Sequence, residues 1–150
     1  MIRNTILFVL TTLTISSCQN ADNDNSQTKI NMSNKKVIET YMDGFRTSDH
    51  AKILSCLTDS VVWEMPGLFH LVGKEQFDKE IENPAFVGSP TITITRLVEE
   101  GNIVIAEGNV IGKFKNGGIL DASFCDVFHF DNNKISRLTG YLMQNKQTGQ

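Results

Sequence analysis

The stretch TITITRLVEEGNIVIAEGNVIGKFKNGGILDASFCDVFHFDNNKISRLTGYLM, residues 91–143, decides the fold of this chain. It is rich in β-branched and aromatic residues, which favour strands, and short turn-forming sequences interrupt it. The interruptions are GN at 101–102, NGG at 116–118 and DNN at 131–133. Because such Gly- and Asn-rich turns join neighbouring antiparallel strands, the stretch predicts a four-stranded antiparallel meander.

Helices are predicted to precede this meander. Apolar residues recur at steps of three and four from Val37 to Phe45, which indicates an amphipathic helix that Ser33 or Asn34 can cap. A second short helix follows with Asp49 as its cap. A strand is predicted at 61–65 and a third helix at 74–81. Helices followed by strands indicate an α+β fold in which the helices cover one face of the sheet.

The composition excludes several classes of partner. The 150 residues carry a formal net charge of −3 without a basic stripe, so we expect no nucleic-acid binding. The three histidines have no ligand-like spacing, and we predict no metal and no other cofactor. Besides Cys18 there are Cys56 and Cys125, which can pair outside the cytoplasm or stay free as buried thiols.

The first residues have the pattern of an export signal. One basic residue, Arg3, precedes an apolar stretch from Ile6 to Ile15 that is too short to span a bilayer, and small residues follow it. The sequence ISSC at 15–18 resembles the lipobox of bacterial lipoproteins, which implies cleavage before Cys18 and acylation of that residue. An ordinary secretory signal that ends near a cysteine is the alternative.

Three segments follow from these patterns. Residues 1–17 are expected to be a lipoprotein signal peptide, and residues 18–33, which are almost entirely polar, a disordered tether. Residues 34–145 are expected to form a single folded domain. We therefore predict an exported protein held at a membrane through lipidated Cys18, on the periplasmic or cell-surface side.

The longest predicted strand, residues 119–130, carries one carboxyl group in an otherwise apolar row. Successive side chains of a strand point to opposite faces. The other members of the Asp126 row are Leu120, Ala122, Phe124, Phe128 and Phe130. Burial in this row would raise the pKa of Asp126 and favour its neutral, hydrogen-donating form. The alternative is a structural carboxylate that accepts from the backbone or pairs with Arg46 or Arg137.

Tyr41 and Glu64 are further candidates for a polar site. Tyr41 lies on the apolar face of the first helix, where its hydroxyl can reach a ligand or simply complete the core. Glu64, at the end of the first strand, can act as a general base at a cavity mouth or face solvent. Because Trp63 and Glu64 point to opposite faces, only one of them can face the cavity. His70, in the loop that follows, is interpreted as a surface residue.

The order of these elements resembles the NTF2-like superfamily, and within it the SnoaL-like and ketosteroid-isomerase-like cone folds. The resemblance covers about residues 34–143. It is carried by TSD at 47–49, LTDSVVWEMPG at 57–67, GKE at 73–75, DVFHFD at 126–131 and KI at 134–135. It implies an NTF2-like cone, in which helices pack on the concave face of a strongly curved antiparallel sheet. It also implies a homodimer formed through the outer face of that sheet.

The resemblance further implies roles for three residues. Against the ketosteroid-isomerase pattern, Tyr41 matches the helix tyrosine of the oxyanion hole, Asp126 the aspartic acid that stays protonated, and Glu64 the general base. In that enzyme an apolar site keeps a carboxylic acid neutral, so that it can donate a hydrogen bond. The chain departs from the pattern at the base, which is Glu rather than Asp and is followed by Met-Pro-Gly.

These residues leave three functions open. The first is binding of a small hydrophobic molecule in an apolar cavity that Tyr41 and Asp126 anchor. The apolar lining would consist of Trp63, Phe77, Leu120, Phe124 and Phe128. The second is an isomerase- or hydratase-type enzyme, in which Glu64 moves a proton next to a carbonyl and Tyr41 and Asp126 stabilise the oxyanion. The third is a dimerising module without a working pocket.

Overall fold

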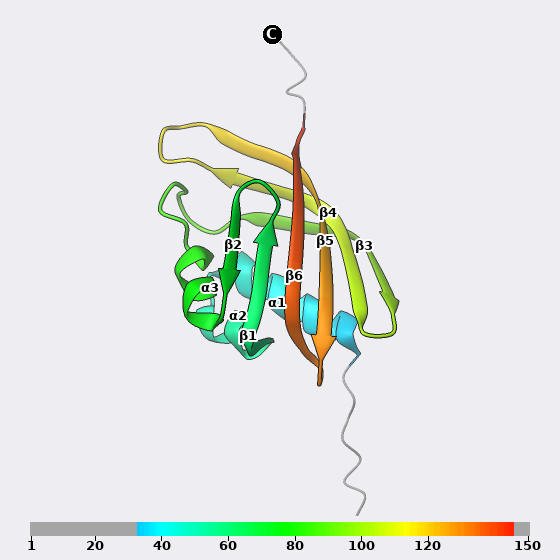
Figure 1. The fold of residues 1–150 in the computed structure, drawn as a ribbon. Coiled ribbons are helices and arrows are strands. Elements are labelled where there is room, and N and C mark those ends of the chain that lie inside the picture. The colour runs from blue at the N-terminus through cyan, green and yellow to red at the C-terminus, as the bar shows by residue number, and fades with distance from the viewer. Residues whose placement is uncertain (1–32, 146–150) are drawn as a thin grey trace, which may run out of the picture.

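Residues 33–145 are described by the computed structural model of this chain, and they form three helices and six strands (Figure 1). The predicted signal peptide, Cys18 and nearly all of the predicted tether lie outside the described residues. None of the described helices is long and apolar enough to cross a membrane. The elements are α1 (Asn34–Thr47), α2 (His50–Ser55), β1 (Leu57–Met65), β2 (Phe69–Val72), α3 (Lys74–Ile81), β3 (Thr91–Glu100), β4 (Ile103–Lys113), β5 (Ile119–Asp131) and β6 (Lys134–Gln144).

The six strands form one sheet in the order β2-β1-β6-β5-β4-β3. The predicted meander is confirmed, because β3, β4, β5 and β6 pair antiparallel in succession. One pair differs from the expectation of a wholly antiparallel sheet: β1 runs parallel to β6. The chain leaves α2 next to the start of β6, where the Ile135 amide donates to the Cys56 carbonyl at 2.8 Å. β1 and β6 therefore begin at the same end of the sheet and run in the same direction.

The segment expected to be a loop after the first strand is instead β2, antiparallel to β1. The segment has only four residues. It is bounded by Gly67 and Gly73, both with positive φ. Because strands are recognised by alternation over a longer run, the two glycines made this segment look like a loop. His70 therefore lies on an edge strand, where it is exposed as expected.

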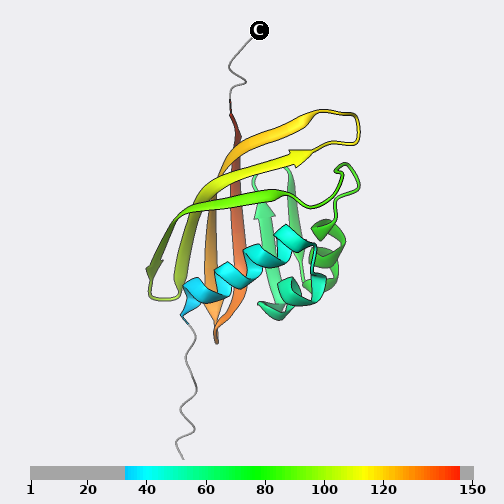
Figure 2. The ribbon, with the colours of Figure 1, turned by 180° about the vertical axis from the view of Figure 1, so that it is seen from behind.

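The sheet curls, and the helices lie against its concave side. Figure 2 shows α1 crossing that side, with α2 at its end. Register shifts occur between Ile94 and Arg96 in the β3–β4 pair and between His129 and Phe130 in the β5–β6 pair. Such irregularities bend a strand and increase its twist. The expected α+β cone, with helices on the concave face of a curved sheet, is thereby confirmed.

The core lies between α1 and the concave face. From α1 it contains Val37, Ile38, Tyr41 and Met42. The predicted alternation of the longest strand is confirmed, since one face of β5 is buried at Ala122, Phe124, Phe128 and Phe130. Phe77 of α3 is 1% exposed and closes the core at one end. Burial of these large side chains supplies most of the stabilising free energy of such a domain.

Contacts at the ends of the helices fix the course of α1. The Asp49 carboxylate accepts from the Lys52 amide at 2.9 Å and caps α2, as predicted. Ser33 occupies the N-cap position of α1, but its hydroxyl donates to Glu99 at 3.0 Å instead of accepting from the helix. A Cβ at Gly44 would lie 2.5 Å from the Ile53 side chain, so glycine permits the close approach of α1 and α2.

Candidate functional site

A cavity opens between α1 and the concave face of the sheet. Its inner end has a volume of about 130 Å³ and is lined by α1, β1, β3, β4, β5 and β6. A wider outer part of about 690 Å³ extends toward α3 and the chain that follows it. The two parts share lining side chains, among them Trp63, Met65 and Val110, so they lie next to each other. A cavity of this size and mostly apolar lining suits a small molecule.

Asp126 is the one carboxyl-bearing residue that lines the inner end. Within residues 33–145, no hydrogen-bond donor and no basic side chain pairs with it. The two alternative partners are engaged elsewhere, since Arg46 donates from Nε to the Ile92 carbonyl at 2.8 Å and Arg137 pairs with Glu64 at 3.3 Å. Burial away from water, with no compensating charge, raises the pKa of Asp126 to about 7. At neutral pH a large fraction of this carboxyl is therefore protonated and able to donate.

Tyr41 lines the same inner end. Its side chain is 3% exposed, and its hydroxyl has no hydrogen-bond partner in the described part of the chain. Burial, and to a smaller extent the charge of Asp126, raise the pKa of Tyr41 well above its usual value. The hydroxyl is therefore protonated at physiological pH and available to a ligand. The structure thus brings together Tyr41 and Asp126, which the sequence proposed as polar anchors.

The predicted apolar lining divides into two groups. Trp63 and Phe124 line the inner end of the cavity, and Leu120 lines its outer part. Phe77 and Phe128 do not line either part. They lie behind it as core residues, with their ring centroids 6.3 Å and 5.5 Å from that of Tyr41. Their contribution is to hold the Tyr41 ring in place.

The structure does not bring Glu64 to this site. Trp63 faces the cavity, so strand alternation turns Glu64 to the other side of β1. Its carboxylate lies 3.3 Å from Arg137 Nη1, and its side chain is 38% exposed. In the sheet it is flanked by His70 of β2 and Thr139 of β6. The assignment of Glu64 as a base stays a prediction from the resemblance, without a cavity-facing position to support it.

Metal ligands do not converge in the described part of the chain. No group of three His, Cys, Asp or Glu side chains among residues 33–145 is placed to hold a metal ion. The expectation that the protein uses no metal or other cofactor stays a prediction.

Comparison with protein families identifies the domain. A model described as a SnoaL-like domain matches residues 38–138, which is more than half of the chain. The chain belongs to the SnoaL-like family. No curated protein matches it.

Solved structures share the fold of this SnoaL-like domain. An LEH-like epoxide hydrolase of M. tuberculosis is 19% identical, with a TM-score of 0.65 over 73% of this chain and 82% of that chain. TerC, co-crystallised with polyporic acid, is 21% identical, with a TM-score of 0.66 over 75% and 91%. A protein of ketosteroid-isomerase-like fold from Catenulispora acidiphila, in complex with trimethylamine, is 13% identical, with a TM-score of 0.65 over 71% and 84%. At these identities the similarity shows the fold alone.

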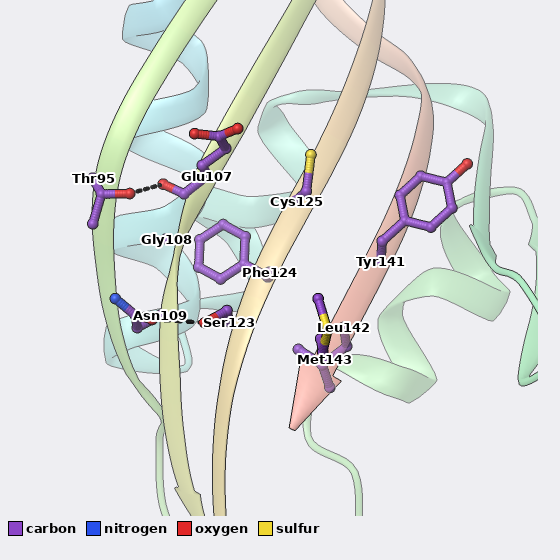
Figure 3. A pocket seen from close by; sticks show the side chains of 10 residues that line it. All are labelled: Thr95, Glu107, Gly108, Asn109, Ser123, Phe124, Cys125, Tyr141, Leu142 and Met143. Carbon is purple, nitrogen blue, oxygen red and sulfur yellow. Dashed lines mark hydrogen bonds between the residues drawn. The ribbon is translucent and has the colours of Figure 1, made fainter. Parts of the chain in front are cut away.

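The outer face of the sheet in this SnoaL-like domain carries a separate, open hollow of about 560 Å³. Figure 3 shows its side chains on β3, β4, β5 and β6, among them Cys125 and Tyr141. Tyr141 and Met143 are 53% and 73% exposed. Cys125 and Cys56 are both free, so they do not pair with each other, and of the two only Cys56 is buried. The homodimer expected from the resemblance would cover this face, and it stays a prediction.

Several lining residues were missed by sequence reasoning. On β6 the inner end is lined by Leu138, Gly140 and Leu142. The alternation that selected Asp126 on β5 also selects these residues, since Asp126 and Gly140 are direct cross-strand neighbours. The signal was therefore present in the strand pattern, but a glycine has no side chain whose chemistry would mark it as part of a site.

Asp126→Asn is expected to remove a pH dependence of stability. The pKa of Asp126 is about 7 in the folded state against 3.8 for the unperturbed group. Between these values the folded state binds more protons than the unfolded state, so the stabilising contribution is present below about pH 4 and is lost as pH rises through about 7. As pH rises from about 4 to about 7, the free energy of unfolding of the wild type should therefore fall relative to that of the variant by on the order of a few kcal/mol.

Denaturant titrations of both proteins at intervals from about pH 4 to about pH 8 measure this difference. A wild type that gains stability relative to Asp126→Asn over this interval would show that the carboxylate has a favourable partner, contrary to the structure.

Proposed function

We propose that this domain binds a small, mostly apolar molecule that presents one hydrogen-bond-accepting oxygen to Tyr41 and Asp126. The observation that carries the proposal is that these two polar groups face an apolar cavity without a protein partner among the described residues. Buried polar groups in native proteins nearly always have a hydrogen-bond partner. The missing partner would be an oxygen of the ligand, or, before the ligand binds, a water that the ligand displaces.

An accepting oxygen fits these groups better than a cation. The Tyr41 hydroxyl donates, and the protonated Asp126 carboxyl donates as well, so two donors can meet one ligand oxygen. Two of the solved structures with this fold contain a small molecule, polyporic acid in TerC and trimethylamine in the C. acidiphila protein. These two complexes show that proteins of this fold bind small molecules, which supports a binding function for this domain.

The isomerase- or hydratase-type alternative finds less support. It needs a carboxylate that accepts a proton and separate donors that stabilise the oxyanion. The inner end offers Tyr41 and Asp126 as donors, but Asp126 is its only carboxyl-bearing residue. Because Glu64 points to the other side of β1, it does not add a base. We therefore favour binding over proton transfer.

Tyr41→Phe is expected to weaken binding of a ketone and to spare a hydrocarbon of the same shape. β-Tetralone and tetralin form such a pair of bicyclic probes. Loss of one hydrogen bond of about 1 kcal/mol should reduce the affinity for β-tetralone roughly fivefold, while that for tetralin stays unchanged. Quenching of the fluorescence of Trp63, the single tryptophan of the chain, measures both affinities.

Tyr141→Phe is the matched control, because Tyr141 is the other tyrosine and lies exposed on the outer face. It should leave both affinities unchanged. The proposal is wrong if neither probe binds the wild type, or if Tyr41→Phe and Tyr141→Phe weaken the binding of the ketone equally.

We also propose, from the sequence, that the domain is exported and held at a membrane by acylation of Cys18. The support is the apolar stretch 6–15 followed by small residues and a cysteine. When the full chain is produced in a bacterium with labelled palmitate, the wild type should take up label and sediment with membranes. Cys18→Ala should lose both properties. Label in the variant, or an unlabelled wild type, contradicts the lipid anchor.

A further inference from the structure

A third polar group at the inner end has no protein partner. Trp63 lines the cavity, and within the described residues its indole N–H donates to no acceptor. The orientation of the ring is fixed, because it stacks on Phe77 with centroids 4.5 Å apart and meets Phe45 and Phe69 edge to face at 6.2 Å and 5.0 Å. Trp63 is half-buried, and a tryptophan N–H that is removed from bulk solvent usually finds a partner. Here the rigid ring holds the donor on the cavity side.

Gly140 leaves space between this donor and Asp126. It lies directly across from Asp126 in the β5–β6 register. A Cβ at this position would lie 3.1 Å from Asp126 Oδ1, 3.5 Å from Met65 Cγ and 3.9 Å from Trp63 Nε1. The carboxyl oxygen and the indole nitrogen therefore border the same small space, and any side chain at position 140 would intrude on it.

We propose that the space in front of Gly140 is a subsite for a single ligand oxygen, which accepts a hydrogen bond from Trp63 Nε1 and contacts Asp126. Trp63 is then a specificity-determining residue, and Gly140 gives the ligand access to it. The inference rests on the proposed function and deepens it, because it names the atom that is recognised and adds a donor that neither the sequence nor the family comparison indicated.

The three borders of the space determine what fits there. An indole N–H only donates, so the group that meets Trp63 must carry a lone pair. A ligand ammonium has no lone pair and would face the positive end of the N–H dipole. Met65 forms an apolar wall on the third side and offers no strong polar contact. A carbonyl or hydroxyl oxygen satisfies these conditions, whereas an ammonium or a hydrocarbon does not.

The direct test uses the wild-type domain labelled with nitrogen-15. Because Trp63 is the single tryptophan, the spectrum contains one indole N–H resonance. Saturating β-tetralone should move its proton downfield, as expected on formation of a hydrogen bond, and tetralin should not. The proposal is overturned if β-tetralone binds in the cavity, seen as shifts of the methyl resonances of Leu138 and Val110, while the indole proton shifts no more than with tetralin.

Two variants test the subsite by affinity. Trp63→Phe keeps a ring against Phe77 and removes the N–H, and Gly140→Ala fills the space. Each should lower the affinity for β-tetralone roughly fivefold or more by calorimetry, and should reduce the advantage of β-tetralone over tetralin. Thr139→Ala is the control, since this neighbour on β6 points to the other side of the sheet and should change neither affinity.

The outcomes separate this inference from the proposed function. If both variants bind β-tetralone as tightly as the wild type does, the subsite is wrong while the cavity remains the binding site. If the wild type binds neither probe, the proposed function fails and the subsite with it. Should Trp63→Phe not fold, the indole resonance of the wild type and Gly140→Ala still decide the matter.

Discussion

The packing of aromatic rings between α1 and the sheet is the interaction on which the remaining structure depends. The Tyr41 ring lies 5.5 Å from Phe128 of β5 and 6.3 Å from Phe77 of α3, and Trp63 of β1 stacks on Phe77 at 4.5 Å. Helices and strands from distant parts of the chain therefore meet at one cluster. Because each buried ring removes a large apolar area from water, this cluster determines where α1 crosses the concave face. It thereby also sets the depth of the cavity.

The same packing explains why polar groups face the cavity unpaired. The rings of Tyr41 and Trp63 pack against Phe128 and Phe77 and hold the helix and the sheet together, while both residues line the cavity. Asp126 joins them because strand alternation gives it the same face as Phe124 and Phe128. Their polar atoms keep some accessible surface at the cavity, where a water or a ligand can pair with them. A site that binds a polar ligand atom explains why the fold keeps them.

Strand periodicity and turn residues were sufficient to predict most of the fold. The meander, the buried row of β5 and the position of Asp126 follow from alternation and from turns such as Asn116-Gly117. Contacts between distant elements could not be read in this way. The four-residue β2 was concealed between two glycines, and the choice between Trp63 and Glu64 depended on which face α1 covers. Gly140 contributes to the site because it has no side chain, and this becomes visible only from its position next to Asp126.

The state of the Asp126 carboxyl tests this account most directly. A carbon-13 NMR titration of the folded domain, with Asp126→Asn to assign the resonance, measures the pKa of this group. We expect a midpoint of about 7, because the carboxyl is removed from water and has no basic partner in the described structure. A midpoint at or below 3.8, the unperturbed value, would show that a positive charge or a set of donors stabilises the carboxylate. The unpaired carboxyl, and with it the ligand site, would then be wrong.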